Sequence, residues 1–241
     1  MARDLYEPPP PRRAAPVSRR AFLGLGRGRV EVDYEDATRR LRAGWSRPGS
    51  EPLLRALEPL TQVLADASGP GEPVLDLPPT AWQDLDLQAL PYADGAFDAV
   101  HSSFGAALAP RARRAASELV RVVRPGGVVA LTAWVPKGLP GRLDELLDRT
   151  EGVPAPSDWG RHEIATRRLD PLLDELELRT RTVQLAFETP DACFDALLAP
   201  YELPRALRPA LERLLASCNN CSGGGVEIDA RYLLAVGRRP Q

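Results

Sequence analysis

From residue 74 onward, short apolar segments typical of buried strands alternate with longer amphipathic segments typical of helices. Strands are expected at residues 74–77, 96–102 and 128–135, and a helix at 111–123 lies between the second and the third. Parallel neighbouring strands need a crossover connection of this kind. The alternation therefore predicts an α/β fold built on a mostly parallel sheet.

The remaining segments extend this pattern in both directions. Helices are expected at residues 36–45 and 51–67 before the first strand, with Pro59 kinking or splitting the second of them. After the third strand, helical spacing predicts helices at 141–149 and 169–176 and a helical region at 191–217. Apolar residues alternate around residues 183–187 and 226–236, which predicts two last strands that pair antiparallel at a sheet edge.

Residues 1–30 have a different composition, with seven arginines against Asp4 and Glu7 and a run of four prolines. We expect a flexible basic arm here, a helical cap over residues 31–70 and an α/β domain over 71–241. Arg19-Arg20 matches the twin-arginine export consensus, but the apolar segment that such a signal needs does not follow. Glycines 24, 26 and 28 resemble a nucleotide-binding loop, yet no buried strand precedes them.

Composition excludes several classes of protein. The formal net charge is −2, and the arginines of the arm are not interleaved with aromatic residues, so nucleic acid is not an expected partner. No apolar run approaches the roughly 18–20 residues that span a bilayer. The three cysteines are too few for a disulfide scaffold, which favours a cytoplasmic location. Cys218 and Cys221 form a single CxxC pair, short of the four ligands of a structural zinc site, so no metal is expected.

Residues 90–135 read LPYADGAFDAVHSSFGAALAPRARRAASELVRVVRPGGVVALTAWVP. This segment resembles the class I S-adenosylmethionine-dependent methyltransferases of the type 11 group. The resemblance rests on Leu90-Pro91-Tyr92, on Phe97-Asp98, on the helix that ends in Arg124-Pro125-Gly126-Gly127, and on Thr132-Ala133-Trp134. It implies a Rossmann-like class I methyltransferase sheet, with N-terminal helices over the cofactor and methyl transfer to a small-molecule acceptor.

The sequence departs from this family between the first two expected strands. The family places there a glycine-rich loop, two helices and two further strands, which need on the order of 40 residues. Only 19 residues separate Leu77 from Phe97. The sheet is therefore expected to be truncated on the cofactor-binding flank. Pro78 and Pro79 stand where the family has glycines, and proline lacks the N–H donor and the backbone freedom that a close approach to the cofactor requires.

Part of the family's site has counterparts in this chain. Asp86 and Leu87 align with the segment whose aspartate accepts a hydrogen bond from the adenine amino group. Asp76, Ser102 and Ser103 would line the crevice at the carboxyl ends of the strands, where ligands of α/β sheets bind. His101, at the end of the second strand, is the candidate catalytic base. Asp76 and Asp86 equally suit local roles at a strand end and a turn, and His101 a structural one.

Three hypotheses about function follow. The first is a methyltransferase-family protein with an eroded S-adenosylmethionine site, inactive alone or weakly cofactor-binding. The alternative is a non-catalytic interaction or regulatory subunit, a homo- or hetero-oligomer that buries its exposed sheet edge against a partner. A third is an internally deleted gene product, which predicts loose packing.

Overall fold

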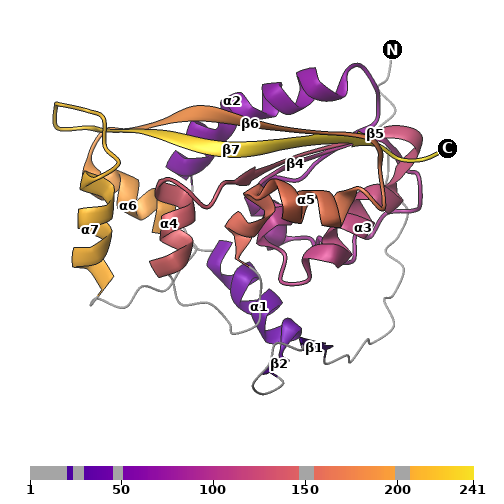
Figure 1. Ribbon diagram of the computed structural model, residues 1–241, viewed down its shortest axis with the longest axis horizontal. Helices are drawn as coiled ribbons and strands as arrows, with labels where there is room; N and C mark the ends of the chain where they lie inside the picture. The colour runs from indigo at the N-terminus through magenta and orange to yellow at the C-terminus, as the bar shows by residue number, and fades with distance from the viewer. Residues whose placement is uncertain (1–20, 24–29, 46–50, 147–154, 199–206) are drawn as a thin grey trace, which may run out of the picture.

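The computed structural model describes residues 21–23, 30–45, 51–146, 155–198 and 207–241 (Figure 1). Residues 1–20 of the expected basic arm, with the twin-arginine motif, lie outside the described residues, as do glycines 24, 26 and 28. Two short strands, β1 (Ala21–Leu23) and β2 (Val30–Val32), pair antiparallel with each other and not with the main sheet.

The main sheet has five strands in the order β3-β4-β5-β7-β6. Strands β3, β4 and β5 run parallel, whereas β7 is antiparallel to both of its neighbours, β5 and β6. The antiparallel pairing expected for the two last strands is confirmed. The strands are β3 (Val74–Asp76), β4 (Phe97–Ser103), β5 (Val123–Trp134), β6 (Asp174–Phe187) and β7 (Val226–Arg238).

Strand β3 forms one edge of this sheet, and no described strand pairs with its outer side. The missing neighbours are those that the short 78–96 connection has no room to encode. The expectation of an α/β sheet truncated on this flank is thus confirmed. The central strand β5 is buried along residues 128–133, as the continuous apolar run predicts for a strand that is covered on both faces.

Helices cover both faces of the sheet (Figure 1). Helix α2 (Glu51–Ser68) lies along one face and buries Leu53, Leu57, Leu60 and Leu64 against it. Helices α3 (Ala112–Val122) and α5 (His162–Leu169) pack on the other face. Helix α2 continues through Pro59, so the expected split is wrong. Burial of the flanking leucines offsets the loss of the backbone hydrogen bond that the proline cannot donate.

The helix expected at residues 169–176 is also wrong. Helix α5 ends at Leu169, and β6 already begins at Asp174. Leucines at helical spacing favour a helix, but Pro171 has no N–H to continue the hydrogen-bond ladder beyond Asp170, which still has helical dihedral angles. The expected helical region 191–217 contains two helices, and residues 199–206 lie outside the described part of the chain.

The remaining described helices are α1 (Tyr34–Trp45), α4 (Leu139–Leu146), α6 (Pro190–Leu198) and α7 (Arg208–Ala216), with short 3-10 turns η1 (Pro79–Gln83), η2 (Ala106–Leu108) and η3 (Pro156–Gly160). Helices α4, α6 and α7 lie near one end of the sheet, and α1 lies beneath the helices of its lower face (Figure 1). Across the described residues, no helix combines the length and the apolar character needed to cross a membrane.

Candidate functional site

The carboxyl ends of β3 and β4 bring two of the predicted site residues together. Asp76 and His101 are direct neighbours across the parallel ladder, and the Asp76 carboxylate lies 3.1 Å from Nδ1 of the imidazole. The other ring nitrogen, Nε2, lies 2.7 Å from Oγ of Ser68 at the end of α2. The imidazole is 5% exposed, so its two partners take the place of water.

This geometry fixes how the imidazole of His101 shares its protons. The carboxylate of Asp76 is an acceptor, so Nδ1 carries a proton. In the neutral ring, Nε2 is then an acceptor for the hydroxyl proton of Ser68. The same hydroxyl lies 3.1 Å from the carbonyl of Ala65, which becomes its acceptor when the ring is protonated and donates at both nitrogens. His101 therefore joins α2 to the sheet edge, with both ring nitrogens directed at protein groups.

The predicted serines at the end of β4 differ in their surroundings. Ser102 is fully buried, and its Oγ accepts the N–H of Ala106 at 2.8 Å, which stabilises the turn η2. Ser103, at the last position of the strand, is half-buried. The first serine is thus engaged in local structure, and the second lies nearer to the surface.

Asp86 and Leu87 lie in the loop that follows η1. The Asp86 carboxylate accepts hydrogen bonds from the backbone N–H of Gln88 at 2.9 Å and from its side-chain amide at 3.0 Å. That amide also donates to Thr38 on α1, and the Gln88 side-chain oxygen accepts the N–H of Arg111. Leu87 is fully buried. The carboxylate predicted to meet adenine thus orders a turn that links α1 to the start of α3.

Trp82 occupies the space beside the ends of β3 and β4. The chain turns at once after β3, because Pro78 and Pro79 start the 3-10 turn η1, which carries Trp82 into the interior. The indole is fully buried, and its Nε1 donates to the carbonyl of Gly105 at 2.8 Å. Helix α1 holds this turn from outside, since Arg42 donates to the carbonyls of Trp82 and Asp84.

The loop after β4 lies directly against the chain that follows β3. Leu77 donates its N–H to the carbonyl of His101 at 2.8 Å. A Cβ atom at Gly105 would lie 2.5 Å from the Leu77 carbonyl and 2.9 Å from that of Pro78, so a side chain has no room there. Phe104 has a positive φ of 61° and stacks on Trp134 with ring centroids 4.0 Å apart. Such a φ is costly for a bulky residue and marks a constrained turn.

Ser68 and Trp82 were not among the residues predicted for this site. Ser68 ends a helix 33 positions before His101, and nothing in its local sequence links it to a strand end. Trp82 follows Pro78 and Pro79 closely, so the signal available in the sequence was a bulky apolar residue beside these two prolines.

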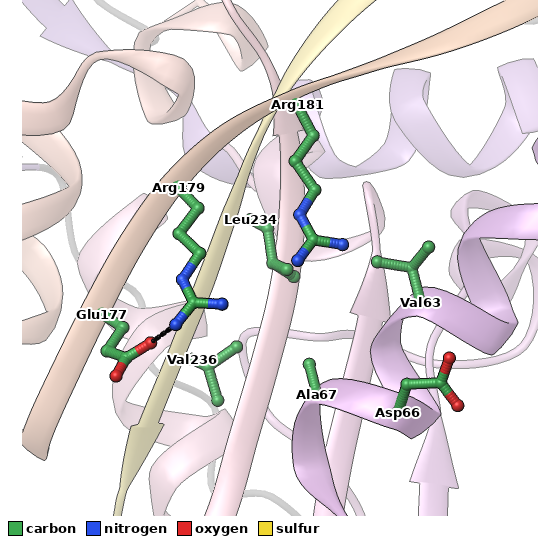
Figure 2. Close-up of a pocket in the computed structure, with 8 residues that line it drawn as sticks. All are labelled: Val63, Asp66, Ala67, Glu177, Arg179, Arg181, Leu234 and Val236. Atoms are coloured by element: carbon green, nitrogen blue, oxygen red, sulfur yellow. Dashed lines mark hydrogen bonds and ion pairs between the residues drawn. The ribbon is translucent and has the colours of Figure 1, made fainter.

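A separate groove of about 300 Å³ lies on the α2 face of the sheet (Figure 2). Guanidinium groups project into it from β6 over apolar side chains of β7, and α2 forms the opposite wall. Arg179 is ion-paired with Glu177 at 2.5 Å. The groove is lined by Val63, Asp66, Ala67, Glu177, Arg179, Arg181, Leu234 and Val236.

The cysteines do not gather with other metal-binding side chains. Cys193 is buried and Cys218 and Cys221 are half-buried, all three as free thiols. Among the residues that the structure describes, no group of three or more His, Cys, Asp or Glu side chains is placed to hold a metal ion.

Comparison with known proteins finds a family model and several relatives that match part of this chain. The family model described as a methyltransferase domain matches residues 56–131, from the middle of α2 to β5. Two uncharacterized proteins of Mycobacterium tuberculosis, Rv1403c and Rv1405c, are 32% and 33% identical to this chain over 120 residues. Each match covers 47% of this chain and 44% of the relative. The chain thus matches less than half the length of these curated relatives.

Solved structures of similar shape include two bacterial proteins. One is a SAM-dependent methyltransferase of Thermotoga maritima, described as a possible histamine N-methyltransferase, with a TM-score of 0.43 and 13% identity over 86% of this chain and 94% of that one. The other is the YcgJ protein of Bacillus subtilis, with a TM-score of 0.43 and 16% identity over 65% of this chain and 70% of that one.

Proposed function

We propose that this chain is a member of the methyltransferase domain family, whose model matches residues 56–131, and that its S-adenosylmethionine site is eroded. In our proposal the α/β fold is retained, the protein does not hold the cofactor in the family's manner, and it acts as a non-catalytic interaction protein. The observation that carries the proposal is the buried indole of Trp82 beside the ends of β3 and β4.

The hydrogen-bonding groups around this crevice support the proposal. A cofactor with a ribose, an adenine and an amino-acid end needs several free donors and acceptors to offset the cost of association. Here the carboxylate of Asp76 bonds His101, and that of Asp86 bonds Gln88 twice. Pro78 and Pro79 offer no N–H at all. The contacts already made by these carboxylates and the two prolines support a site that does not hold S-adenosylmethionine in the family's manner.

Packing supports the retention of a working fold. The region around the shortened connection is filled, since Leu77, Trp82 and Leu87 are all fully buried in the main core. An internally deleted and decayed protein would leave a void at this point, and voids of that size cost several kcal/mol. The filled core therefore supports the hypothesis of an intact fold, in which these side chains fill the space beside the shortened connection.

The test is a calorimetric titration of the purified protein with S-adenosylmethionine and with S-adenosylhomocysteine. We expect no saturable heat up to about 1 mM ligand, which corresponds to a binding free energy weaker than about −4 kcal/mol. Circular dichroism of the same sample should show a cooperative unfolding transition, which separates loss of the site from loss of the fold.

If the titration shows heat of binding, two variants test whether the ligand binds in the crevice. Asp76→Asn removes the carboxylate charge at the end of β3, and Asp195→Asn removes an equivalent charge from the exposed face of α6, away from the crevice. Saturable micromolar binding that Asp76→Asn abolishes and Asp195→Asn preserves would refute the proposal. A search for a small-molecule methyl acceptor would then follow.

A further inference from the structure

Strand β6 is the longest strand of the sheet, and it lies at an edge. It runs from Asp174 to Phe187, pairs with β7 on one side, and has no described strand on its other side. Its outer edge therefore offers a row of backbone N–H and C=O groups, which form hydrogen bonds with any strand that can lie alongside.

The charged side chains near this edge are self-complementary: in an antiparallel pair of two copies, acidic residues of one copy lie opposite basic residues of the other. Glu177 and Arg179 flank Leu178, and both charged side chains are well exposed, at 62% and 59%. They lie on the groove face of the sheet, because residues two apart on a strand share a face. Within one chain they form an exposed ion pair, which contributes little to stability.

We propose that two copies of this chain pair antiparallel through β6, about a two-fold axis that passes through Leu178. In this register Glu177 of each copy lies opposite Arg179 of the other, so that two cross-strand ion pairs form on the groove face. Leu178 meets its equivalent on the opposite face. The interface is isologous, as most homodimer interfaces are, and it joins two five-stranded sheets into one.

Charge also selects the register. Moving the axis by one residue toward the N-terminus places Glu177 opposite itself, and moving it by one toward the C-terminus places Arg179 opposite itself. Like charges directly opposite each other are destabilising in antiparallel pairs. Of these three registers, only the one about Leu178 places no pair of like charges on the axis.

Strand geometry limits the length of this pairing. The ladder between β6 and β7 shifts register between Asp174 and Glu177, and Glu175 has a positive φ of 52°. Such a bulge bends the strand and interrupts regular pairing. Regular pairing resumes at Glu177, so about this axis residues 177–179 pair with the same residues of the second copy, which is at the short end of the range of strand lengths. The pairing needs only this edge and does not depend on the state of the cofactor site.

The experiment measures the mass of the full chain in solution by light scattering and sedimentation over a range of concentrations. We expect a species of twice 26.3 kDa that dissociates on dilution and at high salt, since exposed ion pairs are screened by ions. A mass of 26.3 kDa at every concentration in low salt would overturn the proposal.

Charge reversals then test the interface itself. Glu177→Arg and Arg179→Glu each convert both attractive contacts into repulsive ones, and each should raise the dissociation constant at least roughly tenfold. Mixing the two variants in equal amounts should restore a dimer, because every reversed charge then meets an opposite one. The double variant should dimerise on its own for the same reason.

These combinations also separate loss of pairing from loss of folding. A single variant that fails to fold cannot be recovered by mixing, but the double variant keeps the net charge and still tests complementarity. If both single variants dimerise as tightly as the parent chain, the dimer uses another surface and the proposal is wrong. It is also wrong if neither the mixture nor the double variant dimerises while all of the variants remain folded.

Discussion

Replacing Trp82 with alanine tests the idea that its side chain fills the shortened flank of the sheet. The indole is fully buried, and truncating a buried aromatic residue to alanine costs about 3–5 kcal/mol. The lost hydrogen bond to the Gly105 carbonyl adds about 1 kcal/mol. That carbonyl keeps the N–H of Leu108 as a donor at 3.2 Å, so it is not left unpaired. We therefore expect Trp82→Ala to lower the free energy of unfolding by about 4–6 kcal/mol.

Urea unfolding followed by circular dichroism measures this change, and two phenylalanine variants separate the hydrogen bond from the packing. Trp159 is as deeply buried as Trp82, but its Nε1 has no hydrogen-bond partner among the described residues. Trp82→Phe should therefore cost about 1 kcal/mol more than Trp159→Phe. A loss below about 1 kcal/mol for Trp82→Ala would refute the reasoning, because a side chain that fills a core cannot be removed so cheaply.

Two further predictions concern close packing and a buried thiol. Gly105→Ala places a Cβ 2.5 Å from the Leu77 carbonyl and should cost about 1–3 kcal/mol in urea unfolding, whereas Gly224→Ala, with no atom within 4 Å, should change stability little. Burial raises the pKa of the Cys193 thiol from 9.0 to about 12. Above pH 9 the unfolded chain loses this proton while the folded chain keeps it, so the free energy of unfolding should fall by up to about 1.4 kcal/mol per pH unit. Cys193→Ala should unfold with a smaller dependence on pH over the same range, and an unchanged dependence would contradict the assignment.

Much of the fold can be predicted from the sequence, because several elements are encoded by patterns within short segments. Residues 128–133 predict a buried central strand, since a continuous apolar run suits a strand covered on both faces. The 19 residues between Leu77 and Phe97 predict the truncated flank by length alone. Alternation around residues 183–187 and 226–236 predicts the antiparallel pair, because period two identifies a strand wherever one face is buried.

Other features depend on contacts between distant residues and are not visible in a local pattern. Ser68 meets His101 because the end of α2 lies over β4, which no spacing in the sequence encodes. The start of β6 at Asp174 is hard to see in the sequence, because Leu172, Leu173 and Leu176 have helical spacing although Pro171 interrupts the helix. In the candidate site, the positions of Asp76 and His101 at adjacent strand ends followed from topology. Their bonding to each other and to Ser68 did not.

The position of β7 in the sheet has a consequence for how the protein is made. β7 follows both β5 and β6 in the sequence, yet it lies between them in the sheet, and Val128 pairs with the distant residue Arg238. During synthesis, β5 and β6 leave the ribosome before the strand that joins them exists. Contacts between residues so far apart in sequence slow folding, because a long loop must close before they form. The nascent chain must therefore keep these two strand edges unpaired until β7 has emerged, and removal of β7 would leave the described sheet in two parts.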